Sequence, residues 1–204
     1  MKLFRIDRKI LLSVMTVLVL FGAIIFTFTD FGVASSENTA NSNIGAYSAG
    51  NRTDSVPESI YLFVERNRIH DEMLSRKVSA ELESGGYDVL VSSDLQAEYP
   101  DQALFVSVTD GDLFYTPVHA QSEIDLMFVY SSTGSSEYFE KFRSTDDTVP
   151  VIFTSDGSHR YQLLMHGLIE LRDTTQGLFS GRYYERHIAD TIAEEVARDV
   201  QSHL

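Results

Sequence analysis

The sequence contains no cysteine among its 204 residues. Disulfide bonds, a thiolate nucleophile and a cysteine-ligated zinc site are therefore excluded. Lysine is also scarce, because only Lys2, Lys9, Lys77 and Lys141 occur beside 12 arginines. An acid-rich chain with little lysine and no cysteine is compatible with a prokaryotic protein from a salty habitat.

Positive charge is the second shortage. The chain carries 16 basic side chains against 30 acidic ones, a net charge of −14. Residues 1–58 balance with five of each sign, so the whole acidic excess belongs to residues 59–204. Binding to phosphates needs clustered positive charge, so the composition excludes nucleic acid as a partner. The same acidity disfavours contact between this region and an anionic membrane surface, and it also keeps the domain soluble.

An apolar run without any charge extends from Ile10 to Thr29. As a helix it spans about 30 Å, the thickness of a bilayer core. The run therefore predicts a transmembrane anchor over 10–29, through which the chain contacts the membrane. Basic residues in the segment 1–9 predict a cytoplasmic N-terminus, hence a single-pass cell-membrane protein whose C-terminal domain lies outside. The alternative is a cleaved signal peptide, with cleavage after Ala34.

Small polar residues dominate the next segment, residues 30–58. Such a composition buries too little apolar surface to offset the entropy of ordering, so we expect a flexible linker. Asn51 begins an Asn-Arg-Thr triplet and is a candidate glycosylation site in that linker.

The remaining residues, 59–204, are the length of one domain. A β-rich run over 59–64 predicts a buried strand. Leu74, Val78 and Leu82 recur every four residues and predict a helix, which Gly85-Gly86 ends with a left-handed turn. Residues 87–92 then predict a second strand, so the domain begins with a strand, a helix and a strand.

Farther along the chain the pattern changes to a period of two. It predicts strands over 103–109, 113–118, 124–130, 149–154 and 161–172, with hairpin turns at Asp110-Gly111 and at 155–158. The segment 181–204 predicts a helix with Ile188, Ile192, Val196 and Val200 on one face. The expected fold class is α+β, a mostly antiparallel sheet with two helices packed on one face, preceded by the N-terminal transmembrane helix.

The element order carries a resemblance. The stretch LSRKVSAELESGGYDVLVSSD, the meandering strands and the closing IADTIAEEVARDV helix resemble the layout of small exported assembly domains. Examples of such domains are the lipopolysaccharide-assembly outer-membrane lipoprotein and the N-terminal domain of the propeller protein of the Tol–Pal system. The resemblance implies a binding or assembly role for residues 59–204 by analogy of fold. It rests on element order and not on a motif, and the chain lacks the lipobox cysteine.

No catalytic or metal-ligating motif emerges from the polar residues. The six histidines show no spacing such as HExxH. His166 and Glu170 share one face of a predicted strand, a pattern more typical of an ordinary polar pair than of a metal site. Asp110-Gly111-Asp112 lacks the remaining ligands of a calcium loop. We therefore expect no catalytic residues, no metal and no cofactor.

Alternation along the strands separates two faces. The more uniformly apolar set belongs under the helices: Leu104, Val106, Leu126, Phe128, Met165, Ile169 and Leu171. The opposite set mixes apolar and polar side chains and is the candidate binding face: Phe105, Phe114, Met127, Val129, Leu164, His166 and Leu168. The alternative is that the connection over 131–148 folds over this second face and makes it core.

These observations favour a membrane-anchored extracytoplasmic binding or assembly module over an enzyme, with a protein segment or an apolar ligand as its partner. Two alternatives stay open. One is a cell-surface hydrolase that uses scattered polar groups, and the other is an accessory subunit of a membrane complex held by its anchor helix.

Overall fold

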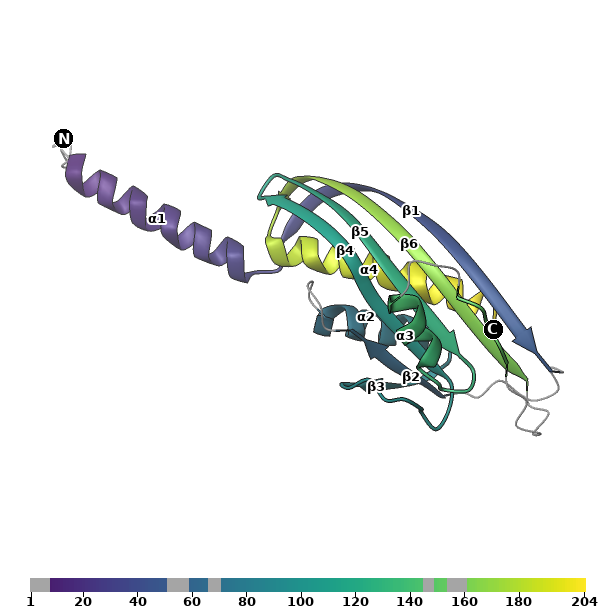
Figure 1. Cartoon of the computed structure of the whole chain (residues 1–204). Helices are drawn as coiled ribbons and strands as arrows, with labels where there is room; N and C mark the ends of the chain where they lie inside the picture. The colour runs from purple at the N-terminus through teal and green to yellow at the C-terminus, as the bar shows by residue number, and fades with distance from the viewer. Residues whose placement is uncertain (1–7, 51–58, 66–70, 145–148, 154–160) are drawn as a thin grey trace.

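The computed structural model describes residues 8–50, 59–65, 71–144, 149–153 and 161–204. The elements in chain order are α1 (Arg8–Phe28), β1 (Gly32–Ala49), β2 (Ser59–Val64), α2 (Asp71–Ser84), β3 (Asp88–Ser92), β4 (Ala103–Thr116), β5 (His119–Ser131), α3 (Glu137–Ser144), β6 (Gln162–Phe179) and α4 (Gly181–Gln201). Figure 1 shows the strands as one curved sheet, with α1 extending away from it at one end.

The described strands form one sheet in the order β1-β6-β5-β4-β2-β3. The pairs β1–β6, β6–β5 and β5–β4 are antiparallel, whereas β2 runs parallel to both β4 and β3. The α+β class holds, but the prediction of a mostly antiparallel sheet is wrong because the sheet is mixed. The parallel pairing arises because α2 crosses between β2 and β3 and returns the chain in the same direction.

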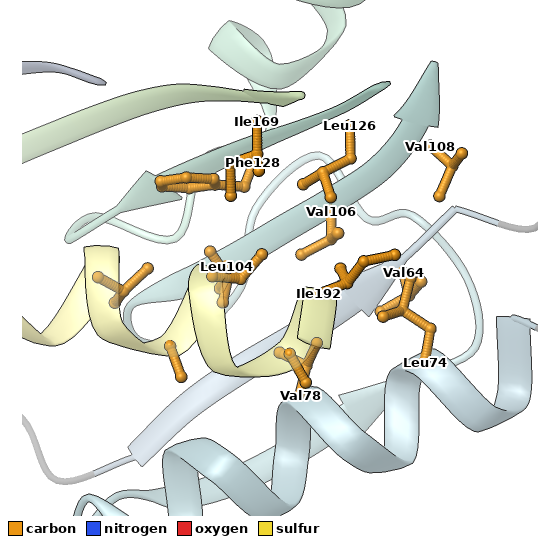
Figure 2. Close-up of a cluster of buried hydrophobic side chains, with 14 of the residues drawn as sticks. Val64, Leu74, Val78, Leu104, Val106, Val108, Leu126, Phe128, Ile169 and Ile192 are labelled. Atoms are coloured by element: carbon orange, nitrogen blue, oxygen red, sulfur yellow. The ribbon is translucent and has the colours of Figure 1, made fainter. Parts of the chain in front are cut away.

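The main core lies between the sheet and the two helices α2 and α4. Leu74, Val78 and Leu82 of α2 are buried there, at the four-residue spacing that one helical face requires. The sheet contributes the set that alternation assigned to this side: Leu104, Val106, Leu126, Phe128, Met165, Ile169 and Leu171. Figure 2 shows Leu104, Val106 and Leu126 between the strands and the helices, with Ile192 and Val78 opposite. The predicted inner face is confirmed.

A second, smaller core lies on the opposite face of the sheet, under α3. Phe139 of α3 is fully buried and stacks on Phe105 of β4, with ring centroids 5.3 Å apart. Arg143 of α3 forms an ion pair with Glu65 just beyond β2. Ser107 donates a 2.5 Å hydrogen bond to the same carboxylate. These contacts fix α3 over one half of the outer face.

No helix in the described part of the chain combines the length and the apolarity that crossing a membrane requires. The helix α1 forms where a helix was expected. The predicted transmembrane anchor over 10–29 is therefore wrong. The signal-anchor interpretation, with a cytoplasmic N-terminus and an extracytoplasmic domain, is corrected with it, as is the single-pass cell-membrane location.

Residues 32–49, expected as part of a flexible linker, form β1 instead. All 18 residues pair in antiparallel register with β6, from Gly32 opposite Phe179 to Ala49 opposite Gln162. The segment is ordered by the backbone groups of a neighbouring strand rather than by its own apolar content. Asn51 lies outside the described residues.

Two local predictions on the strands also change. Asp110-Gly111 is not a hairpin turn: β4 continues to Thr116, and the register shifts between Val108 and Asp110 as in a β-bulge. The turn lies beyond Thr116, whose hydroxyl accepts a 3.0 Å hydrogen bond from the backbone N–H of His119. Residues 149–153 form no strand, and the turn expected at 155–158 lies outside the described residues.

Candidate functional site

The strand β1 forms one edge of the sheet. It pairs with β6 on one side along its full length, and no described strand pairs with its other side. The strand has no lysine and no proline, and Glu37 is its sole charged residue. Protected sheet edges usually carry lysine or proline, or they are short. The opposite edge, β3, has five residues and is protected by its shortness. The edge of β1 is long and lacks such protection.

The outer face next to β1 is acidic. Register aligns Asn41, Glu170, Asp125 and Asp110 in one row across β1, β6, β5 and β4. A second row aligns Thr39, Arg172, Glu123 and Asp112 in the same strand order. Six carboxylates lie on this part of the face: Glu37, Asp110, Asp112, Glu123, Asp125 and Glu170.

Arg172 is the cation within these rows. It pairs with Glu123 at 2.7 Å, so one of the carboxylates is neutralised locally. Burial raises the pKa of Asp125, and the carboxylates of Glu170 and Asp110 raise it further. No group of three or more His, Asp or Glu side chains in the described ranges has metal-binding geometry. The open half of the face is therefore a diffuse anionic surface.

A shallow depression of about 500 Å³ lies on this open half. Asp112, Phe114 and Gln121 contribute to its lining, together with Glu123 and Arg172. Phe114 is 56 % exposed, and its ring lies 6.2 Å from that of His119. The depression combines one aromatic ring with carboxylates, which suits a cationic side chain better than an apolar ligand.

The residues predicted as a binding face separate into two groups. Phe105, Met127, Val129 and Leu164 are buried in the second core. This half of the face is therefore core, as expected under the alternative in which the connection over 131–148 folds over it. His166, Leu168 and Phe114 lie beyond or at the margin of the α3 cover. The ring of His166 stacks on that of Phe142 with centroids 3.9 Å apart, and burial lowers the His166 pKa. Leu168 is 45 % exposed.

A buried polar network links β1, β6 and α4 on the inner side of the sheet. The Asp173 side chain is fully buried, and its Oδ1 lies 2.9 Å from Nε2 of His187. The Thr175 hydroxyl donates a 2.8 Å hydrogen bond to Oδ2 of Asp173. Ser36 of β1 shares a 2.7 Å hydrogen bond with that threonine. The carboxylate thereby connects the edge strand to the helix that covers the core.

The same network has the residue types of an acid–base dyad, but the described part of the chain shows no reacting partner for it. Among the described residues, the hydrogen bond of the His187 ring runs to Asp173, and the Thr191 hydroxyl bonds to the His187 backbone carbonyl instead. A catalytic dyad needs a nucleophile or substrate within reach of the second ring nitrogen. Burial raises the pKa of the Tyr184 phenol well above its usual range, so that phenol stays protonated. The arrangement is suited to holding α4 in place.

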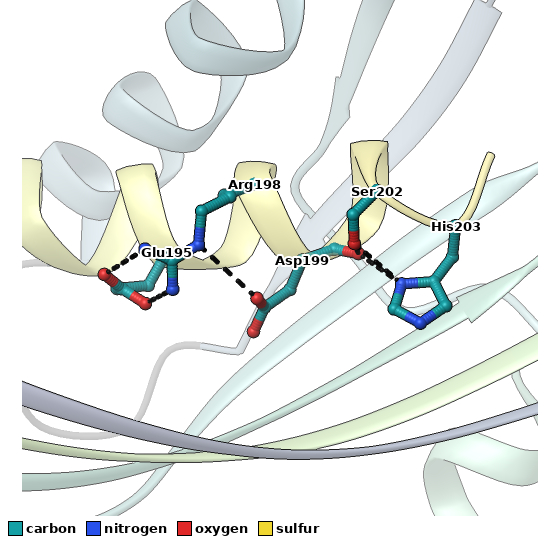
Figure 3. Close-up of polar contacts among 5 residues, drawn as sticks. All are labelled: Glu195, Arg198, Asp199, Ser202 and His203. Atoms are coloured by element: carbon teal, nitrogen blue, oxygen red, sulfur yellow. Dashed lines mark hydrogen bonds and ion pairs between the residues drawn. The ribbon is translucent and has the colours of Figure 1, made fainter.

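A second buried carboxylate lies in the last turns of α4. Figure 3 shows Asp199 beside the bidentate pair of Glu195 with Arg198. The Asp199 backbone carbonyl accepts a 2.9 Å hydrogen bond from the Ser202 hydroxyl and lies 2.9 Å from Nδ1 of His203. These bonds close the C-terminal end of the helix, where free carbonyl groups need partners.

A groove of about 400 Å³ lies at the carboxyl ends of the parallel strands β2 and β3. Open α/β sheets often bind ligands at this position. Its lining includes Glu72 and Arg76 of α2 and the serines Ser92 and Ser93. Because the two charges are opposite in sign and close together, the groove favours neither an anion nor a cation.

The free edge of β1 was missed by sequence reasoning, as was the Asp173 network. Strands made of Ser, Asn, Ala and Thr lack the apolar alternation that identifies a strand. One signal was present: residues 32–49 contain no proline and only one charged residue. A solvated linker has no need to exclude proline and charge, whereas a paired strand does. The Asp173 network had no sequence signal, since Ser36 lies 139 residues from Thr175 and no motif links Asp173 to His187.

No protein-family model matches the chain, and none of the curated proteins matches it. Similar solved structures include the PelC dodecamer from Paraburkholderia phytofirmans, with 10 % identity and a TM-score of 0.40. A single-residue variant of that dodecamer gives 11 % identity and a TM-score of 0.36. Each comparison covers 78 % of this chain and 98 % of the PelC chain. At these values the likeness carries no argument about function.

Proposed function

We propose that this protein is a binding and assembly module that takes up an extended segment of a partner chain at the free edge of β1. The observation that carries the proposal is the 18-residue strand that pairs with β6 on one side and has no described strand on the other. An added strand gains main-chain hydrogen bonds along this edge, the basis of recognition by β-augmentation. An assembly role is also what the resemblance in element order implies.

The edge is held in a rigid frame, which favours binding. Ser36 is tied through Thr175 to the buried carboxylate of Asp173, and α4 packs beneath the strand. A preorganised edge loses little conformational entropy when a partner strand is added. The six-stranded sheet therefore offers β1 as a fixed template for pairing rather than as a loose segment.

Amide hydrogen exchange along β1 tests this function. In a strand paired on one side, alternate backbone N–H groups point toward the free edge and exchange quickly. A neutral nine-residue peptide that alternates Thr and Val is the probe. We expect it to protect the outward-facing amides of β1 by at least about tenfold, because they become hydrogen-bonded in the added strand. Protection confined to other surfaces, or absent altogether, contradicts the proposal.

A pair of proline variants provides the matched control. Successive amides of a strand point to opposite sides, so one of Asn41 and Ser42 directs its N–H toward β6 and the other toward the free edge. Proline is tolerated where the N–H faces solvent and breaks the ladder where it does not. Of N41P and S42P, we expect one to fold normally and to have lost peptide binding. Normal binding by that folded variant counts against edge pairing.

A further inference from the structure

We propose that the segment bound at the β1 edge is an amphipathic basic strand of another protein, with lysine or arginine on the outer face and apolar residues on the side of α4. This inference rests on the proposed function and names the chemistry of the partner. Two independent features of the chain carry it, the charge of the outer face and the apolar margin of the main core beneath β1.

The charge of the outer face favours a basic partner. Ser36 contacts Thr175 on the inner side, so its neighbour Glu37 points to the outer face, as side chains alternate along a strand. A strand added beside β1 places its outer-face residues next to Glu37 and about 10 Å from Glu170, two strand spacings away. That distance is close to the screening length in about 0.1 M salt. Basic side chains at these positions are attracted, and acidic ones are repelled.

The opposite side of β1 favours apolar residues in the partner. Ala34, Ala40 and Ile44 are partly buried and pack against the main core. They lie at the margin of that core, where the sheet ends. An added strand whose inward side chains are apolar extends the core past these three residues and removes more of their surface from water. Alternation of basic and apolar residues thus satisfies both faces of the edge.

The net charge also argues against a second copy of this chain as the partner. Two copies bring together two domains that each carry the acidic excess of residues 59–204. Such like-charged domains repel one another at low salt. The acidic excess therefore disfavours pairing of β1 edges between two copies. It favours a cationic partner at the same unprotected edge.

Three nine-residue peptides test the inference on the intact chain. One alternates Lys and Val, one alternates Glu and Val, and the third is the neutral Thr–Val peptide. In about 50 mM salt we expect the Lys–Val peptide to bind at least about tenfold more tightly than the Glu–Val peptide. In about 0.5 M salt the ratio should fall several-fold. A fourth peptide, with its Lys and Val residues in two blocks, is the control for pattern and should bind weakly, since it lacks an amphipathic strand.

Variants locate the effect. E37Q should weaken Lys–Val binding about threefold more than it weakens Thr–Val binding, because it removes one facing charge. The matched control is D88N, which removes the same charge from β3 at the opposite edge of the sheet. We expect D88N to change neither affinity. Equal losses in E37Q and D88N show a nonspecific charge effect and overturn the inference.

The outcomes separate this inference from the proposed function. Equal binding of all three alternating peptides, with β1 amides protected, retains the edge as a binding site and overturns its preference for a basic strand. Absence of β1 protection by every peptide overturns both. Concentration-dependent dimers that protect β1 without peptide identify a second copy as the partner and also overturn the basic-strand inference.

Discussion

The Nε2 atom of His187 lies 2.9 Å from the Oδ1 atom of Asp173, and the aspartate side chain is fully buried. When His187 is protonated, this contact is a buried ion pair between α4 and β6. Removing one member of such a pair leaves the other without compensation. The carboxylate is shared by His187 and Thr175, so its removal deprives two side chains of a partner.

Replacing Asp173 with alanine should lower the free energy of unfolding by about 3 kcal/mol, because Thr175 and His187 lose their shared acceptor. The variant D173N retains an acceptor oxygen and should lose only about 1 kcal/mol. Urea unfolding measures both values. The exposed D112N variant is the control and should change stability by less than about 0.5 kcal/mol. Equal losses in D173A and D173N contradict the role of the carboxylate.

Gly167 of β6 lies directly opposite Phe128 of β5, and a Cβ atom at Gly167 would come within 2.1 Å of the phenylalanine ring. G167A should therefore destabilise the fold by about 1–3 kcal/mol, since the packed ring has no space to move. Combining it with F128L should recover part of that loss, which a double-mutant cycle detects as a coupling energy.

The matched control for this prediction is G45A. A Cβ atom at Gly45 meets the end of the exposed Tyr47 side chain at 3.2 Å, and that side chain is free to move. We expect G45A to change thermal stability by less than about 0.5 kcal/mol. Additive effects of G167A and F128L would show that the ring and the glycine do not constrain each other.

The stacked ring of His166 predicts a loss of stability in acid. Burial lowers its pKa in the folded state below the ordinary value of 6.5. The unfolded chain therefore takes up the proton first as the pH falls below 6.5. Above pH 6.5 the neutral His166 ring makes its full contribution to the stability of the fold. That contribution is lost as the pH falls through the lowered pKa of the folded state. Melting curves between pH 7.5 and about 4.5 should show a smaller decline for H166F, which keeps the stack on Phe142 but cannot titrate. An unchanged decline argues against this effect.

The row formed by Asp110, Asp125 and Glu170 predicts repulsion across three strands. Like charges in directly opposite positions are destabilising, so D125N should raise stability at pH 7 by up to about 1 kcal/mol. The Asp125 pKa is raised in the folded state, so the charged carboxylate lowers the stability of the fold by its full amount at neutral pH. This destabilisation decreases as the pH falls through the raised pKa and is absent below the ordinary value of 3.8. Chemical unfolding at two salt concentrations should show a smaller gain in high salt. A gain independent of salt would indicate a cause other than charge.

The parts of the fold that sequence predicted are those with a local periodic signal. Leu74, Val78 and Leu82 identified α2, and Ile188, Ile192 and Val196 identified α4, because burial of one helical face imposes a fixed spacing. Alternation along β4, β5 and β6 likewise separated the inner face from the outer one. In these segments local pattern and tertiary packing require the same residues.

The parts that were missed depend on distant segments. Residues 32–49 lack the apolar alternation of a strand, since their partner β6 supplies the hydrogen bonds that order them. Asp110-Gly111 favours a tight turn locally, yet the long pairing of β4 with β5 absorbs it as a bulge. The site was missed for the same reason: Ser36 joins Asp173 and His187 only when β1 pairs with β6.

The pairing of β1 with β6 also determines when the protein is able to finish folding. Ala49 and Gln162 are 113 residues apart, and Gly32 and Phe179 are 147 apart. At about 5–20 residues per second, a ribosome needs roughly 6–30 s to make the strand that β1 requires. During that interval the nascent chain carries an unpaired strand, and β5 lacks its later neighbour β6. Completion of the sheet is thus expected to be a late event in folding, as the slow folding of sheets with distant partners implies.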